Sequence, residues 1–244
     1  MPCQLPIGIH FCKNMTVYSK HQTEQIKVVH KIEKLFRQNK ISAVSKIENY
    51  EKDPRICLTS VHFPSKKLTK IISNKIIKPL QKIDKNVFYY PPESLHLTIK
   101  NIRTINNPPD FKSDDLLTAK KVFLKVIPKY NKFKIYYYKL VIYPNSLSLV
   151  CTTDPELDLI FSKLDKALNK AGLPDNKFYA NKRYIISNMT LARFYSPPTL
   201  EFKNEVKRIS ELDIFDDYLV DSVTLLTANA AMKNRKIIGK WKLQ

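Results

Sequence analysis

Two stretches of the sequence that lie 92 residues apart share one pattern. SLHLTIK occupies positions 94–100 and ISNMTLA positions 186–192, and in each a polar ring or amide stands two residues before a threonine. The offset is the same from His96 to Asn188 as from Thr98 to Thr190. A pattern that returns at a fixed offset is typical of a repeated structural unit. The sequence therefore predicts two related halves, each with one such strand.

Apolar periodicity predicts strands and helices in alternation along most of the chain. Strands are expected at 56–63, 94–102, 133–143, 146–152, 184–194, 218–228 and 237–243, and helices at 65–82, 113–126, 156–171 and 199–212. A hairpin at Pro144-Asn145 and the short links between elements argue against a purely parallel sheet. We therefore expect an α+β fold, a duplicated two-lobed arrangement of mostly antiparallel sheets flanked by helices around a central cleft.

The first part of the chain differs from this regular pattern. Residues 21–40 place one apolar stripe among Lys and Glu, which predicts an amphipathic helix; the stripe consists of Ile26, Val29, Ile32, Leu35 and Phe36. A basic amphipathic helix can lie on a membrane surface, but a modest apolar face favours docking on its own domain. We expect residues 1–53 to form an N-terminal extension with this helix, and residues 54–244 to form the domain.

The repeated strand carries chemistry because side chains of a strand alternate between its two faces. His96, Thr98 and Lys100 are expected on one face of the first strand, and Asn188 and Thr190 on one face of the second. Cleavage of a phosphodiester needs a group that accepts a proton, a group that donates one, and hydrogen-bond donors for the phosphoryl oxygens. Imidazole titrates near neutrality and threonine hydroxyls donate, so this set requires no metal. Both polar faces are expected to line one cleft.

These residues resemble the two HxT motifs of the two-histidine (2H) phosphoesterase superfamily, which includes 2′-5′ RNA ligase-like proteins and cyclic nucleotide phosphodiesterases. The resemblance extends over residues 54–243 and includes Phe63-Pro64 and the stretch from Thr190 to Arg193. It implies a metal-independent phosphodiesterase without a cofactor, whose substrate is RNA or a small nucleotide with a 2′,3′-cyclic phosphate or a 2′-5′ linkage. It also implies that His96 is catalytic and that Thr98 and Thr190 bind the phosphate.

Asn188 stands where the second motif of the superfamily has a histidine. An amide can hydrogen-bond a phosphoryl oxygen, but it cannot exchange a proton near pH 7. Loss of one positioned proton-transfer group lowers a rate by about 10² to 10⁴. Two functions stay open: a phosphodiesterase, and a nucleotide- or RNA-binding protein of the same fold that has lost turnover. A scaffold whose charge binds RNA nonspecifically is a third.

Several further side chains are candidates for substrate contacts. Lys100 and Arg193 could attract a phosphate, although strict alternation turns Arg193 away from Thr190 unless the strand bends. Phe178 and Tyr179 could stack on a base, or could pack as ordinary strand aromatics. His62 could replace the missing histidine if its strand end borders the cleft, but a single histidine in a strand more often has a structural place.

Composition sets the remaining expectations. Lys and Arg number 42 against 22 Asp and Glu, which gives a formal charge of +20 and favours a polyanionic partner or simply solvated helix faces. The three glycines lie far apart, which excludes glycine-rich phosphate loops. The four cysteines form no CxxC pair and no leader precedes them, so we expect no metal site, no disulfides and a cytoplasmic location. A monomer that does not enter a membrane is favoured.

Overall fold

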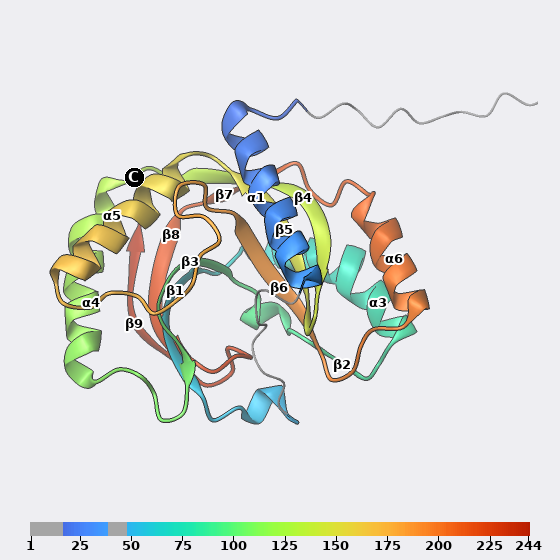
Figure 1. Cartoon of the computed structure of the whole chain (residues 1–244), viewed down its shortest axis with the longest axis horizontal. Helices are drawn as coiled ribbons and strands as arrows, with labels where there is room; N and C mark the ends of the chain where they lie inside the picture. Colours follow the sequence, from blue (N-terminus) through green and yellow to red (C-terminus); the bar gives the residue numbers. More distant parts are fainter. Residues whose placement is uncertain (1–16, 39–47) are drawn as a thin grey trace, which may run out of the picture.

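A computed structural model describes residues 17–38 and 48–244 of the chain (Figure 1). The helices are α1 (Lys20–Arg37), α2 (Lys66–Ile72), α3 (Lys78–Ile83), α4 (Ser113–Val126), α5 (Glu156–Lys170) and α6 (Leu200–Ser210). The strands are β1 (Ile56–His62), β2 (Val87–Tyr89), β3 (Leu97–Asn106), β4 (Phe133–Tyr143), β5 (Ser146–Thr153), β6 (Ser187–Phe194), β7 (Asp217–Val220), β8 (Ser222–Ala228) and β9 (Arg235–Lys242). None of the described helices has the length and apolar composition that a membrane span requires.

The strands form two separate antiparallel sheets. Sheet A has the order β3-β1-β8-β9, and sheet B has the order β2-β6-β5-β4-β7. Helices α4 and α5 pack together beside sheet A, whereas α3 and α6 pack together beside sheet B (Figure 1). The two motif strands, β3 and β6, lie against each other where the sheets meet. The expected α+β fold with two antiparallel lobes is confirmed.

The region predicted as a single strand at 218–228 is two strands. β7 pairs with β4 at the edge of sheet B, and β8 pairs with β1 and β9 in sheet A. Asp221 separates the two strands, and its carbonyl accepts a hydrogen bond from the Leu243 amide. Because a β-rich run shows no difference between one sheet and the other, the periodicity could not reveal that the chain crosses between them.

The N-terminal helix α1 docks on sheet B, as its amphipathic pattern predicts. Ser19 and Gln22 form a capping box at the N-terminus of the helix. Gln25 is fully buried, and its amide donates to the Thr153 hydroxyl and to the Ile185 carbonyl while it accepts from the Thr153 amide. A buried side chain with three hydrogen bonds fixes the helix to the sheet at one point.

Gln25→Ala should destabilise the protein by about 1–3 kcal/mol, because the backbone amide and hydroxyl of Thr153 then lose their buried partner. Urea denaturation monitored by circular dichroism measures the free energy of unfolding. Lys31→Ala, at an exposed position of the same helix, is the control and should change it little. Equal effects of the two substitutions would show that the Gln25 hydrogen bonds do not hold α1 in place.

Candidate active site

The first motif strand, β3, contains a bulge directly after Thr98. Val61 of β1 pairs with Thr98 and the next β1 residue, Ser60, pairs with Lys100, so Ile99 is an extra residue on β3. Neighbouring residues of β1 point to opposite faces, and paired residues share a face. Thr98 and Lys100 therefore lie on opposite faces of sheet A, although strict alternation predicts one common face. We call the side that Thr98 occupies the motif face of sheet A.

The second motif strand, β6, has its bulge at the equivalent place. Ser148 of β5 pairs with Thr190 and Leu147 pairs with Ala192, which makes Leu191 the extra residue. Every second residue of β5 points to the same face, and three of these residues pair with β6. The pairs are Val150 with Asn188, Ser148 with Thr190, and Ser146 with Arg193. This bulge brings Arg193 onto the same side as Thr190, which we call the motif face of sheet B. Ile99 and Leu191 keep the offset of the repeat, so the irregularity belongs to both halves.

His96 immediately precedes β3 and is 9% exposed. Its Nδ1 lies 2.8 Å from the carbonyl oxygen of Ser94, which is a hydrogen bond that Nδ1–H donates. Burial, together with the charges of Arg193 and Arg235, lowers the pKa of His96 to about 4, against the opposing effect of the Ser94 hydrogen bond. The ring is therefore neutral at pH 7, with an unprotonated Nε2 that can accept a proton.

Tyr90 connects the two motif strands. Its ring centroid lies 6.4 Å from that of His96, and its hydroxyl accepts a hydrogen bond from Nε of Arg193 at 3.3 Å. The Tyr90 backbone amide also donates to the carbonyl of Leu191, within β6, at 2.9 Å. One residue from each motif, His96 just before β3 and Arg193 on β6, thus lies beside the same tyrosine. The two motifs thus meet at this tyrosine, and that their polar faces line one cleft stays a prediction.

Sequence reasoning missed Tyr90 and Arg235. Neither is in a motif, and Arg235 comes from β9, far along the chain from His96. The available signal was composition, because arginine provides only seven of the 42 basic residues. Two of these seven act electrostatically on His96. Arginine rather than lysine thus provides the cations that act on the motif histidine.

The expectation that Lys100 contacts a phosphate is wrong for a geometric reason. The bulge at Ile99 turns its side chain to the helix side of sheet A, where it is completely buried. Its ammonium pairs with Asp165 of α5 at 2.6 Å and with Asp175, and it lies 4.1 Å from the centroid of the Phe161 ring. With two carboxylates and a ring around it, this ammonium has a structural place.

His62 does not replace the missing histidine either. It is 2% exposed, and it follows Val61 on β1, so it points away from the motif face. Its Nδ1 lies 2.9 Å from the Ser222 carbonyl and its Nε2 lies 3.0 Å from the Tyr218 hydroxyl. Both ring nitrogens are occupied, so the structural interpretation of His62 holds.

The two candidate stacking residues have different surroundings. The Tyr179 ring packs edge-on against Phe161 at 4.9 Å between centroids and lies 4.9 Å from the Lys100 ammonium, so it belongs to the buried cluster around Lys100. Phe178 is 73% exposed on the segment between α5 and β6. Only Phe178 of the two offers a free ring face, and stacking of a base on it stays a prediction.

Helix α1 covers part of the motif face of sheet B. Val29 packs with Val141 and Val150, and Val150 is the direct cross-strand neighbour of Asn188. The Phe36 and Tyr143 rings lie 5.0 Å apart at the other end of the contact. The view in Figure 1 shows the helix in front of β5. Asn188 therefore lies beside a strand position that α1 covers.

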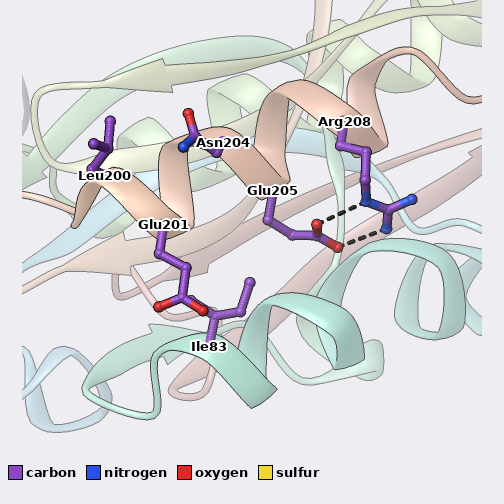
Figure 2. Close-up of a pocket in the computed structure, with 6 residues that line it drawn as sticks. All are labelled: Ile83, Leu200, Glu201, Asn204, Glu205 and Arg208. Carbon is purple, nitrogen blue, oxygen red and sulfur yellow. Dashed lines mark hydrogen bonds and ion pairs between the residues drawn. The ribbon is translucent and has the colours of Figure 1, made fainter.

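A hollow elsewhere on the molecule is not lined by the motif residues. Figure 2 shows it between α3 and α6, where Glu205 and Arg208 form an ion pair and Leu200 is exposed. Its lining includes no motif residue and no histidine. We assign it no role in the chemistry.

Comparisons with known proteins identify the fold. No protein-family model matches the sequence, and no curated protein matches it. E. coli LigT complexed with 3′-AMP superimposes with a TM-score of 0.51 at 12% identity, over 78% of this chain and 98% of LigT. A phosphoesterase superimposes with a TM-score of 0.50 at 12% identity, over 78% of this chain and 98% of its own. A conserved protein of unknown function from Agrobacterium tumefaciens superimposes with a TM-score of 0.58 at 13% identity, over 76% of this chain and 87% of its own. The chain thus has the fold of E. coli LigT and of this phosphoesterase.

Proposed function

We propose that this protein is a slow, metal-independent phosphodiesterase that acts on RNA ends or small nucleotides, with a 2′,3′-cyclic phosphate or a 2′-5′ linkage as the bond that breaks. The observation that carries the proposal is the hydrogen bond that fixes the tautomer of His96. Its Nδ1 is committed to the Ser94 carbonyl, so the unprotonated nitrogen is Nε2. A neutral imidazole fixed in one tautomer is suited to accept a proton from an attacking hydroxyl or water.

The remaining motif residues have complementary roles in this mechanism. For a 2′,3′-cyclic phosphate, a water oxygen attacks phosphorus as His96 Nε2 accepts its proton, and one ring P–O bond breaks. The hydroxyls of Thr98 and Thr190 donate to the non-bridging oxygens, and the Arg193 guanidinium offsets the developing negative charge. The leaving oxygen takes its proton from solvent, because the Asn188 amide has none to give near pH 7. Turnover is therefore slow.

Two arguments support a nucleotide at this site. The LigT structure with the same fold holds 3′-AMP. In this chain the threonine hydroxyls and the Arg193 guanidinium would provide donors for a phosphate on the two motif faces. The second candidate function, a nucleotide- or RNA-binding protein without turnover, is favoured by Asn188 alone.

One screen separates these functions. The protein is incubated in EDTA with 2′,3′-cyclic AMP, with RNA that ends in a cyclic phosphate and with 2′-5′ oligoadenylate, while both cleavage and binding are recorded. Cleavage that His96→Ala abolishes supports the enzyme. Binding without cleavage, weakened by His96→Ala, supports the second candidate. Absence of both would refute a nucleotide function at this site.

The pH dependence of cleavage should show an unusually low acid limb. Since the basic form of His96 is the active one and its pKa lies at about 4, kcat/KM for 2′,3′-cyclic AMP should stay level as the pH falls from about 8 to about 5 and decline only near pH 4. A continuous assay over this range measures it. An acid limb near 6.5, the ordinary value for histidine, would show that His96 is not held neutral in the free enzyme.

A further inference from the structure

Arg235 lies at the first position of β9 and is fixed at three points. Its Nη1 donates to the Glu93 carbonyl at 2.8 Å and to the Met232 carbonyl at 3.2 Å. The guanidinium carbon lies 5.0 Å from the centroid of the Phe63 ring, at the position for a cation–π contact. These contacts restrain the side chain on one face and leave further N–H groups of the fork for another acceptor.

The backbone segments that accept hydrogen bonds from Arg235 also bind His96 and Tyr90. Glu93, which receives Arg235, precedes Ser94, whose carbonyl holds His96. The Tyr90 hydroxyl, which receives Arg193, donates in turn to the Ala230 carbonyl, two residues before Met232. Arg235 thus contacts both the turn at 92–94 and the turn at 229–234, whereas His96 is held by the first turn and Arg193 is linked to the second through Tyr90. They form one connected set although they come from three different parts of the chain.

The turn at 229–234 is built to hold this position. Met232 adopts a positive φ of 57°, which is uncommon for a residue other than glycine and persists where the surroundings impose it. The buried Asn229 imposes it from within, because its Oδ1 accepts from the Lys233 amide at 3.1 Å and its Nδ2 donates to the Glu51 carbonyl at 3.1 Å. The Met232 carbonyl thus reaches Arg235 from a fixed backbone.

Neither of the two motif residues at the proton-transfer positions carries a charge. The Asn188 amide is neutral, and the buried His96 is neutral as well. On this connected set the positive charge comes from the two guanidiniums, and the side chain of Glu93, whose carbonyl receives Arg235, is exposed. A guanidinium keeps its charge at every pH of interest and binds phosphate oxygens through two parallel N–H groups. Two fixed positive charges match a phosphate group that carries two negative charges.

We propose that Arg193 and Arg235 form a two-guanidinium subsite that selects a dianionic phosphomonoester, namely a nucleoside 2′- or 3′-monophosphate or an RNA strand that ends in one. This inference rests on the proposed nucleotide site and specifies its ligand. A phosphodiester or cyclic phosphate carries a single negative charge, whereas a phosphomonoester carries about 1.5 to 2 at pH 7, with a second pKa of about 6. The product of cyclic phosphate hydrolysis is then the tightest ligand, and it would slow turnover further.

Isothermal titration calorimetry with the full chain tests this subsite. The ligands are 3′-AMP and 2′,3′-cyclic AMP, each at pH 7.5 and pH 5.0 and at one ionic strength. At pH 7.5 we expect 3′-AMP to bind about 10-fold more tightly, and we expect this advantage to shrink to less than about threefold at pH 5.0, where the monoester is largely a monoanion. A guanidinium keeps its charge at both pH values, so the change in charge match comes from the ligand.

Variants assign the effect to Arg235. Arg235→Gln should weaken 3′-AMP binding at pH 7.5 by about 10-fold and cyclic AMP binding by less than about threefold, since a charge-assisted hydrogen bond is lost mainly for the dianion. Arg208→Gln removes the same charge from α6, where Arg208 pairs with Glu205, and should change neither affinity. Arg235→Lys keeps the charge without the fork and should retain part of the preference, which shows that the loss in Arg235→Gln is not misfolding.

The outcomes separate this inference from the function on which it rests. Equal affinities for 3′-AMP and cyclic AMP at pH 7.5, or equal losses in Arg235→Gln and Arg208→Gln, would overturn the subsite and leave the nucleotide site intact. If neither nucleotide binds, the proposed function and the subsite are both refuted.

Discussion

Asn188→His should accelerate cleavage of 2′,3′-cyclic AMP by about 10² or more, because it adds a second titratable group on the motif face of sheet B and a positioned proton donor contributes about 10² to 10⁴ in rate. The substitution leaves Thr190 and Arg193 in place on the same face. The variant should also show a bell-shaped pH profile, since one ring must be unprotonated and the other protonated. Initial rates in EDTA, across pH, measure both effects.

Three variants make this result specific. Asn188→Gln keeps an amide and should not gain activity, whereas Asn188→His combined with His96→Ala should lose the gain because the proton acceptor is missing. Affinity for nucleotides should change little in any variant that retains His96. Robust cleavage by the natural protein that Asn188→His destroys would contradict the view that Asn188 is a missing proton donor, and would give the amide itself an active role.

Lys100→Met should destabilise the protein by about 3–5 kcal/mol, the effect of removing one partner from a buried ion pair. The Lys100 side chain is 0% exposed and that of Asp175 is 4% exposed, so the substitution takes the ion-pair partner from a buried carboxylate. Lys182, 3.8 Å from Asp165, compensates only at the exposed end of the cluster. Chemical denaturation measures the loss.

Removal of the unpaired charges should reverse this loss. Asp165→Asn and Asp175→Asn, added to Lys100→Met, should recover most of the stability, because neutral amides are less costly to bury than carboxylates. Lys120→Met, at an exposed position of α4, is the control and should have little effect. If Lys100→Met instead folds normally and loses nucleotide affinity, the phosphate contact first expected for Lys100 would be restored and the structural interpretation would be wrong.

The motif strands show how far local sequence reaches. Alternation of polar and apolar residues correctly indicated that Asn188 and Thr190 share a face of β6. The same alternation failed for Lys100 and Arg193, in opposite directions. A bulge adds one residue to a strand relative to its neighbour, and every residue beyond it changes face. Whether a bulge forms depends on the pairing with β1 and β5, which the local pattern does not contain.

The sequence by itself determined the α+β class, the amphipathic helix that docks on the sheet, the repeated motif and the asparagine at position 188, because each depends on residue identity or on spacing within one element. Only the tertiary structure decided that Lys100 is buried in an ion-pair cluster, that His62 has both ring nitrogens occupied, and that Arg193 joins Thr190. It also decided that Arg235 comes to His96 from the far end of the chain. Charges and hydrogen bonds of a site act through space, so residues distant in sequence complete it only after the sheets have formed.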